Sequence, residues 1–462
     1  MSRHLRNFNT RNLYGCSGVF VVVGLILLHL SQAIYFVAGN TARIGSIGLG
    51  FGFILAAAYL RTRRSLFRHA PFVIGSGGYF MVLIFLSNFQ DHIIWDDGVK
   101  QVFCVVCIFM FWAGYILARE KRHASVLADQ WSLVGMAGVA IVCLLAFLRF
   151  VKDISFYGGF RGFGETGLNP VGVAYSNTCL ALIFVVLGTL NHGRIRKRVY
   201  FSAACCAVFV VLSSASRGAL GWGACALIFF LLLNRLRKFF YVKNLLIAVV
   251  SFIVIVLTSF WLYTGNYAIS ERLGILTQRF TTLFYSFDGG VKGGIVDRSI
   301  SEREIIWKET VKTFDQWIIL GDKGYEGYPH NQWLEILKRF GLLGIPLLIM
   351  SVGLFFWLSW NVLTRKMRVD VEFSLIATLF VYAYLQSLSS LSLEMNRVLW
   401  LGFGYFIGYY VKRSKHRRRS YRLGSAREPE RILASTSVGM QSVGGDDCSS
   451  ARILKKVRDL CP

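Results

Sequence analysis

The chain has 462 residues, of which 55% are hydrophobic, 15% aromatic and only 16% charged. Apolar runs of about 18 residues or more recur along it, which is typical of a transmembrane protein and excludes an ordinary soluble fold. The formal net charge is +26, but most Lys and Arg residues stand in short segments between apolar runs. They therefore indicate membrane topology and not nucleic-acid binding.

The first apolar run, Tyr14 to Ala38, is too long for the core of a cleavable signal peptide and lacks a small-residue cleavage site, so we expect it to be the first span. The same pattern of apolar runs continues to the last hundred residues and predicts an all-α polytopic membrane protein. The twelve predicted spans lie near residues 14–38, 44–60, 71–88, 99–117, 131–150, 171–190, 199–213, 219–233, 244–263, 342–363, 373–391 and 398–411.

Charge predicts the orientation of these spans. With the N-terminus in the cytoplasm, the basic segments RTRRSLFR, REKR, RIRKR, RLRKFFYVK, TRKMR and KRSKHRRR all fall on the cytoplasmic side, and the loops on the other side are poor in Lys and Arg. We predict four regions: nine spans in residues 1–263, a large outer loop in 264–341, three spans in 342–411, and a basic tail in 412–462. The tail is polar, which favours disorder, and its basic stretch is expected to lie against anionic lipid.

Cysteine and acidic residues do not predict a metal site. Most of the ten cysteines lie inside apolar runs, where they are expected to act as small buried hydrophobic residues. Cys104 and Cys107 form a CxxC pair in mid-span with no His, Asp or Glu beside them. His92, Asp96 and Asp97 in the DHIIWDDG segment match no closed coordination pattern, and we interpret this segment as a solvated loop.

Two outer segments are too long to be simple turns, and loops of this size are usually functional. The first, residues 152–172, is rich in glycine and carries Arg161, whose surrounding backbone could bend around a phosphate group. Between two other spans, Arg217 stands in the small-residue segment SSASRGAL at the predicted outer boundary. Ionisable groups at that depth suggest a functional site, although an arginine there could also contact lipid phosphate.

The second long segment contains YPHNQWLEILKRFGLLG. Pro329 suits a first helical turn and Gly341 suits a helix end. The spacing of His330, Trp333 and Phe340 predicts that they share one helix face, directed toward packed structure. Near a helix N-terminus the imidazole should stay neutral, as a general base requires, although a structural histidine bonded to a loop carbonyl is the alternative.

Upstream, Arg298 to Gly321 predicts an amphipathic helix. Arg303 falls within its apolar stripe, where it could either bind an anion through its forked guanidinium group or extend to a polar rim. The stripe consists of Ile300, Trp307, Val311, Phe314 and Ile318.

Taken together, several of these strings resemble the O-antigen ligase and O-antigen polymerase superfamily of bacterial envelope enzymes. The strings are HNQWLEILKRFGLLG with the preceding GDKG, REIIW at Arg303, SRGAL at Arg217 and the NP pair Asn169 and Pro170. Their order and spacing are similar to those of the family, and the resemblance covers almost the whole chain except the tail.

The resemblance implies a metal-independent glycosyltransferase with a GT-C-like architecture and no cofactor, in the bacterial inner membrane with its active site facing the periplasm. The donor would be a glycan on undecaprenyl diphosphate, and the acceptor a sugar hydroxyl of the lipid A core. Arg217 and Arg303 would hold the diphosphate, and His330 would engage the acceptor hydroxyl. Arg161, Arg298, Asn331 and Glu335 are expected to contact substrate.

Other functions use the same features. A polymerase, which joins lipid-linked repeat units, would need the same donor site, and a protein O-oligosaccharyltransferase would be expected to carry a larger periplasmic domain. A transporter of lipid-linked sugars would be expected to have internal repeats and broken polar helices at mid-bilayer, and we find neither in the sequence. The ligase is therefore the preferred prediction, with the polymerase as its closest alternative.

Overall fold

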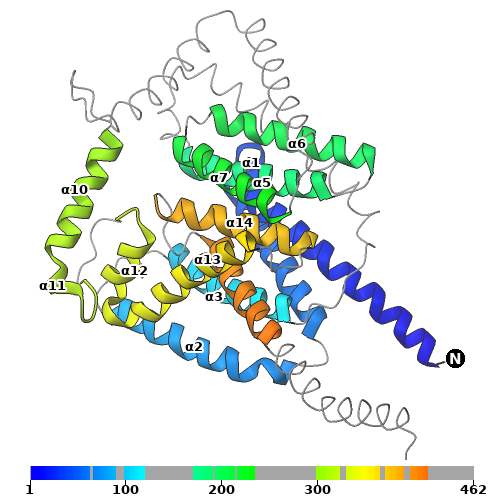
Figure 1. The fold of residues 1–462 in the computed structure, drawn as a ribbon, viewed down its shortest axis with the longest axis horizontal. Coiled ribbons are helices and arrows are strands. Elements are labelled where there is room, and N and C mark those ends of the chain that lie inside the picture. The colour runs from blue at the N-terminus through cyan, green and yellow to red at the C-terminus, as the bar shows by residue number, and fades with distance from the viewer. Residues whose placement is uncertain are drawn as a thin grey trace, which may run out of the picture. The chain divides into compact units, whose positions relative to one another are not determined.

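The structure is a computed structural model that describes residues 2–62, 66–89, 98–119, 170–190, 193–213, 216–234, 298–322, 329–364, 370–389 and 396–414. Within these ranges the regular elements are all helices and there is no strand (Figure 1). The chain forms two compact units, Met1–Tyr409 and Tyr410–Pro462, and the contacts below all lie in the first. The all-α prediction is thus confirmed for the part of the chain that the structure describes.

The helices follow one another in the order that the apolar runs predict. Their bounds are α1 Ser2–Thr62, α2 Leu66–Phe89, α3 Gly98–Arg119, α5 Pro170–Leu190, α6 Arg194–Ser213, α7 Arg217–Leu233, α10 Arg298–Lys312, α11 Phe314–Trp317, α12 Gln332–Phe340, the 3₁₀ turn η3 Gly341–Gly344, α13 Ile345–Leu363 and α14 Val371–Ser387. A further helix covers residues 397–414.

Among the described residues, three helical segments are long and apolar enough to cross a membrane: Thr41–Thr62, Gly172–Leu190 and Gln332–Leu363. Shorter apolar helices coincide with other predicted spans, at Ser17–Ser31, Val105–Arg119, Gly218–Leu233 and Val371–Ser387. These helices give the chain the character of a membrane protein. The total of twelve spans stays a prediction, and the predicted spans 131–150 and 244–263 lie outside the described residues, as do most of the outer segment 152–172 and nearly all of the tail.

Helix α1 contains two predicted spans, packed against each other. The rings of Phe20 and Phe53 have centroids 5.3 Å apart, and a Cβ atom added to Gly24 would lie 2.6 Å from the Gly50 carbonyl oxygen. Positions far apart in one helix can meet only if the chain reverses, so α1 doubles back between these contacts. The backbone around Arg43 is helical, whereas the sequence predicted a short loop there.

Helix α14 lies at the centre of the described core, beside α5 and α7 (Figure 1). Every residue from Phe373 to Tyr384 is buried, which is expected of a helix that is apolar all round. Phe380 contacts Phe403 and Phe406 of helix 397–414, with ring centroids 5.5 and 5.0 Å apart. Helix α14 is consequently held in place by helices on several sides, and its final residue, Ser387, contacts Gln332 of α12.

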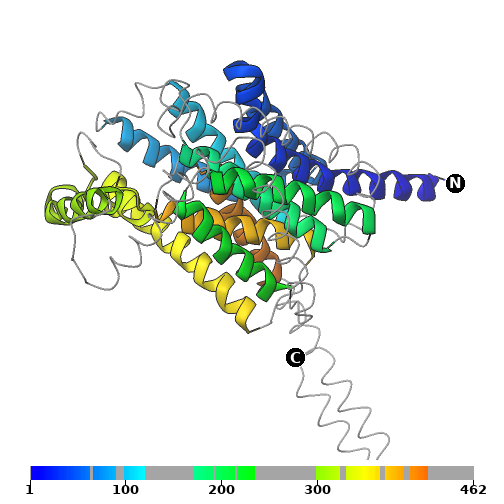
Figure 2. The same cartoon turned by 90° about the horizontal axis from the view of Figure 1, so that it is seen from above.

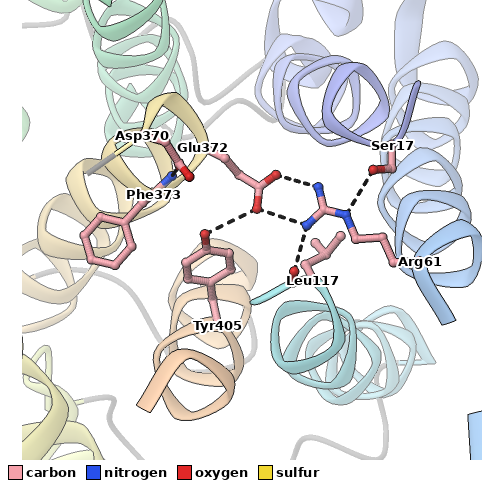
Figure 3. A network of polar contacts seen from close by, with 7 residues as sticks. All are labelled: Ser17, Arg61, Leu117, Asp370, Glu372, Phe373 and Tyr405. Carbon is pink, nitrogen blue, oxygen red and sulfur yellow. Dashed lines mark hydrogen bonds and ion pairs between the residues drawn. The ribbon is translucent and has the colours of Figure 1, made fainter. Parts of the chain in front are cut away.

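A buried ion pair joins distant helices at one end of the bundle (Figure 3). Arg61 approaches Glu372 with both terminal nitrogens, with Nη1 to Oε1 at 3.1 Å and Nη2 to Oε2 at 2.6 Å. Arg61 also donates to Ser17 Oγ at 3.0 Å and to the Leu117 carbonyl at 2.7 Å, and the Tyr405 hydroxyl donates to Glu372 at 3.3 Å. The network therefore connects α1, α3, α14 and helix 397–414. Ser17, Arg61, Leu117 and Glu372 all stand near ends of predicted spans that the charge pattern assigns to one side of the membrane. The orientation itself stays a prediction.

We expect Glu372→Gln to lower the free energy of unfolding in detergent micelles by about 3–5 kcal/mol, because it leaves the buried Arg61 guanidinium without its compensating charge. The side chains of Arg61 and Glu372 are only 2% and 14% exposed. Glu304→Gln is the matched control, since Glu304 pairs with Lys308 at 2.7 Å on an exposed helix face. Equal unfolding midpoints for the two variants would contradict this account of the ion pair.

Candidate active site

Helix α12 begins one residue after Asn331, which is its N-cap. The Asn331 side chain accepts hydrogen bonds from the backbone N–H groups of Trp333 at 2.9 Å and Leu334 at 3.3 Å. Pro329 and His330 therefore precede the helix, and the prediction that His330 shares a helix face with Trp333 and Phe340 is wrong. The predicted end at Gly341 is confirmed: its φ is 54°, and a Cβ atom there would lie 2.5 Å from the Ile319 carbonyl oxygen.

His330 has an unusual backbone conformation. Its φ is 53°, and among the described residues it is the one non-glycine residue with a positive φ. A left-handed conformation costs an L-residue roughly 1–2 kcal/mol and persists only where its surroundings impose it. Here the neighbours on both sides are fixed: the Pro329 carbonyl accepts a 2.6 Å hydrogen bond from Trp307 Nε1, and Asn331 caps α12. Backbone strain of this kind is concentrated at functional sites, so the imidazole of His330 is a candidate functional group.

The His330 imidazole is half-buried and close enough to Arg303 for the two charges to interact. Burial lowers its pKa from the ordinary value of 6.5, and the positive charge of Arg303 lowers it further. The neutral form is thus favoured at neutral pH, as the sequence predicted. The cause differs, because burial and Arg303 replace the helix dipole on which that prediction was based.

The acid titration of His330 tests this environment directly. Because the folded-state pKa lies below 6.5, His330 should react with diethyl pyrocarbonate, which modifies neutral imidazole, down to a lower pH than an exposed histidine does. Below pH 6.5 the unfolded chain takes up a proton at His330 more readily than the folded protein does. The free energy of unfolding therefore decreases as the pH falls below 6.5. In Arg303→Gln the reactivity midpoint should rise but stay below 6.5, since burial remains. Peptide-level mass spectrometry resolves His330 from the other histidines, and an unchanged midpoint in Arg303→Gln would contradict the interaction.

Helix α10 positions Arg303. Trp307, one turn after Arg303, donates the hydrogen bond to Pro329 that fastens α10 to the segment before α12. Residues four apart lie on the same side of a helix, so this contact holds Arg303 toward His330. The predicted helix from Arg298 to Gly321 is divided at Thr313, where α10 gives way to the short helix α11.

Buried polar side chains hold α12 against its neighbours. Gln332 has no exposed surface, its Nε2 donates to Ser351 Oγ of α13 at 2.8 Å, and its Oε1 accepts a hydrogen bond from Ser387 Oγ of α14. Glu335 is also fully buried and pairs with Arg339 at 3.4 Å on the same helix. This contact is structural, and the predicted role of Glu335 in substrate binding stays a prediction.

Arg217 is the first residue of α7, and that helix begins near the same end of α14. A Cβ atom on Gly218 would lie 3.8 Å from the Gln386 amide and from Ser389 Oγ, and Trp222 Nε1 donates to Ser389 Oγ at 2.9 Å. Since Ser387 bonds Gln332, the starts of α7 and α12 both meet the final turn of α14. Because both helices contact the same end of α14, the backbones of Arg217 and His330 lie at one end of the bundle.

The other predicted site residues are less fully described. For Arg217 and Arg298 the structure describes the backbone alone, and the same holds for Cys104. Arg161, His92, Asp96 and Asp97 lie outside the described residues. In the part of the chain that is described, no group of three His, Cys, Asp or Glu side chains could hold a metal ion.

The sequence indicated Trp307 only as part of an apolar stripe and did not single out Gln332 or Tyr384, although all three support the site. Trp333 Nε1 donates to the Tyr384 hydroxyl at 3.0 Å, and the Tyr384 ring stacks on Phe355 with centroids 4.3 Å apart. An asparagine directly before a periodic apolar run is a recognised N-cap signal, and it could have located the start of α12. No comparable signal exists for the contacts with α13 and α14. No model of a known protein family matches the sequence, and no curated protein matches it; the function is therefore inferred from the residues and their arrangement.

Proposed function

We propose that the chain is a metal-independent glycosyltransferase of the O-antigen ligase kind, with about twelve spans in a GT-C-like arrangement. It would act at the periplasmic face of the bacterial inner membrane and move a glycan from undecaprenyl diphosphate to a sugar hydroxyl of the lipid A core. The observation that carries the proposal is a half-buried His330 with a lowered pKa and strained backbone, held beside Arg303 at the end of an apolar helix bundle.

These two residues match the two needs of the reaction. The neutral imidazole of His330 can take the proton of the acceptor hydroxyl while the hydroxyl oxygen bonds to the anomeric carbon of the donor. The bond from that carbon to the phosphate oxygen then breaks, and its electron pair leaves with the lipid diphosphate. Arg303 can stabilise the negative charge that collects there, with Arg217 as the second proposed cation.

The same donor site would serve a polymerase, so the acceptor must be identified by experiment. We expect deletion of the gene in its native bacterium to remove all long glycan chains from the lipid A core while polymer accumulates on the lipid carrier. Core carrying a single repeat unit would identify a polymerase instead. An unchanged glycan ladder would contradict both functions, and complementation with His330→Gly separates loss of activity from loss of the protein.

A further inference from the structure

Helices α10 and α11 carry an apolar surface that the described part of the chain leaves exposed. Trp307, Val311 and Phe314 follow one another at spacings of four and three, and they are 37%, 60% and 46% exposed. Just after α11, Ile319 and Leu320 are 64% and 54% exposed. We call these five residues the α10–α11 apolar stripe. The sequence predicted the first three as part of an apolar stripe on an amphipathic helix; in the structure they are exposed, and another face packs.

The packed face lies beside the stripe. Thr310 is 2% exposed and Trp317 is 1% exposed, and Trp317 Nε1 donates to the Thr310 carbonyl at 3.0 Å. The Glu304–Lys308 pair, whose side chains are 59% and 76% exposed, borders the stripe on its other side, because Glu304 stands seven residues before Val311 in the same helix. A helix with a packed face, an exposed apolar stripe and charged side chains along the edge of that stripe is typical of the boundary between membrane and water.

Helix α13 provides a reference for the bilayer itself. Together with the preceding turn η3, it carries a row of exposed residues that are each between 49% and 67% exposed: Leu342 in η3, and Ile349, Phe356, Trp360 and Leu363 in α13. At 1.5 Å per residue this row extends for about 31 Å, which equals the thickness of a bilayer hydrocarbon core. The row lies on the segment Gln332–Leu363, which is apolar enough to cross a membrane, so it is the natural lipid-facing side of this helix.

The stripe joins this row at one end. The Leu342 N–H donates to the Ile319 carbonyl at 3.2 Å, and Gly341 leaves no room for a side chain against the same stretch of backbone. Asp322 is also tied to α12, through a 2.7 Å bond from its N–H to the Lys338 carbonyl and an ion pair with Lys338 at 3.3 Å. Figures 1 and 2 both place α10 and α11 beside the α12 end of α13.

We propose that α10 and α11 lie in the membrane interface at the Leu342 end of α13, with the α10–α11 apolar stripe inserted among phospholipid acyl chains. The stripe and the exposed row on α13 are joined through the backbone, and the row is as long as the hydrocarbon core is thick. The lipid that covers the row therefore also covers the stripe. Glu304 and Lys308, along the edge of the stripe, then meet the lipid headgroups. Arg303, between the stripe and the packed face, is placed at the depth of lipid phosphates, beside His330.

Photocrosslinking tests this placement in the full chain without removing any native residue contact in the core. A diazirine amino acid is introduced at Val311, or at Glu309 as the matched control, because Glu309 is exposed and lies two residues away on the opposite side of the helix. The purified protein is reconstituted in vesicles of phosphatidylethanolamine and phosphatidylglycerol, irradiated and digested. We expect a phospholipid adduct on the peptide labelled at Val311 and none on the peptide labelled at Glu309.

A third label at Phe356, on the lipid-facing row of α13, is the positive control. An adduct at Phe356 with none at Val311 would overturn the proposal, and so would equal adducts at Val311 and Glu309. A crosslink from Val311 to another protein chain in native membranes would also overturn it, because a protein would then cover the stripe. The readout needs no catalytic activity, so its failure is distinct from failure of the proposed enzyme function.

Discussion

Replacing His330 with glycine should abolish glycan transfer while leaving the folded protein as stable as the wild type or more so. The imidazole is the proposed base, and loss of a general base costs about 100- to 10,000-fold in rate. Glycine adopts the positive φ of 53° at no steric cost, so the substitution also removes backbone strain of roughly 1–2 kcal/mol. A loss of activity without a loss of stability would separate a catalytic role of the imidazole from a structural one.

The measurement pairs the transfer rate in reconstituted vesicles with the unfolding midpoint in detergent micelles. His330→Asn is the matched control, because asparagine tolerates the left-handed region but cannot act as a base. It should be inactive and of near wild-type stability. Substantial transfer by either variant would remove His330 from the mechanism, and a large loss of stability in His330→Gly would show that the imidazole is a structural group.

Arg303→Gln should reduce kcat by about 100- to 1000-fold, the range found when one donor to a developing negative charge is removed. The effect should fall on kcat more than on KM, because the leaving diphosphate gains its charge in the transition state. Arg303→Lys should retain part of the activity, since it keeps the charge but loses the forked geometry.

Lys308→Gln provides the control on the same helix. Lys308 is exposed and pairs with Glu304 at the surface of α10, so its loss should leave the transfer rate unchanged. Steady-state kinetics with purified variants at equal protein concentration makes the comparison. Equal rates for Arg303→Gln and the wild type would contradict the proposed role, as would an equal loss in Lys308→Gln.

The apolar pattern of the sequence located several helices well, because a run as long and as apolar as Gly172–Leu190 or the second half of Gln332–Leu363 is rarely found outside a membrane-spanning helix. The same pattern did not identify which apolar environment each face meets. Trp307, Val311 and Phe314 were correctly predicted to form one stripe, yet they are exposed while Thr310 and Trp317 are buried. Periodicity reports that a face avoids water, and lipid satisfies that requirement as well as protein does.

The sequence singled out the pair His330 and Arg303 but not its geometry, and the catalytic roles of both residues stay predictions. The strings containing His330 and Arg303 indicated both side chains, and the structure brings their charges within reach of each other. The backbone of His330 was not predictable, because the helical phase was counted from Pro329 and the cap is Asn331. Contacts between residues far apart in sequence, such as Arg61 with Glu372 or Gln332 with Ser387, leave no local signal.

The central claim is tested most directly by supplying the purified protein with its proposed substrates in vesicles. These are a labelled glycan on undecaprenyl diphosphate and lipid A core as acceptor. The account predicts that label moves to the core in the absence of added metal, that undecaprenyl diphosphate is released in equal amount, and that His330→Gly does neither. Movement of the intact lipid-linked glycan across the vesicle membrane, with the bond to the diphosphate unbroken and no labelled core, would contradict it and identify a transporter.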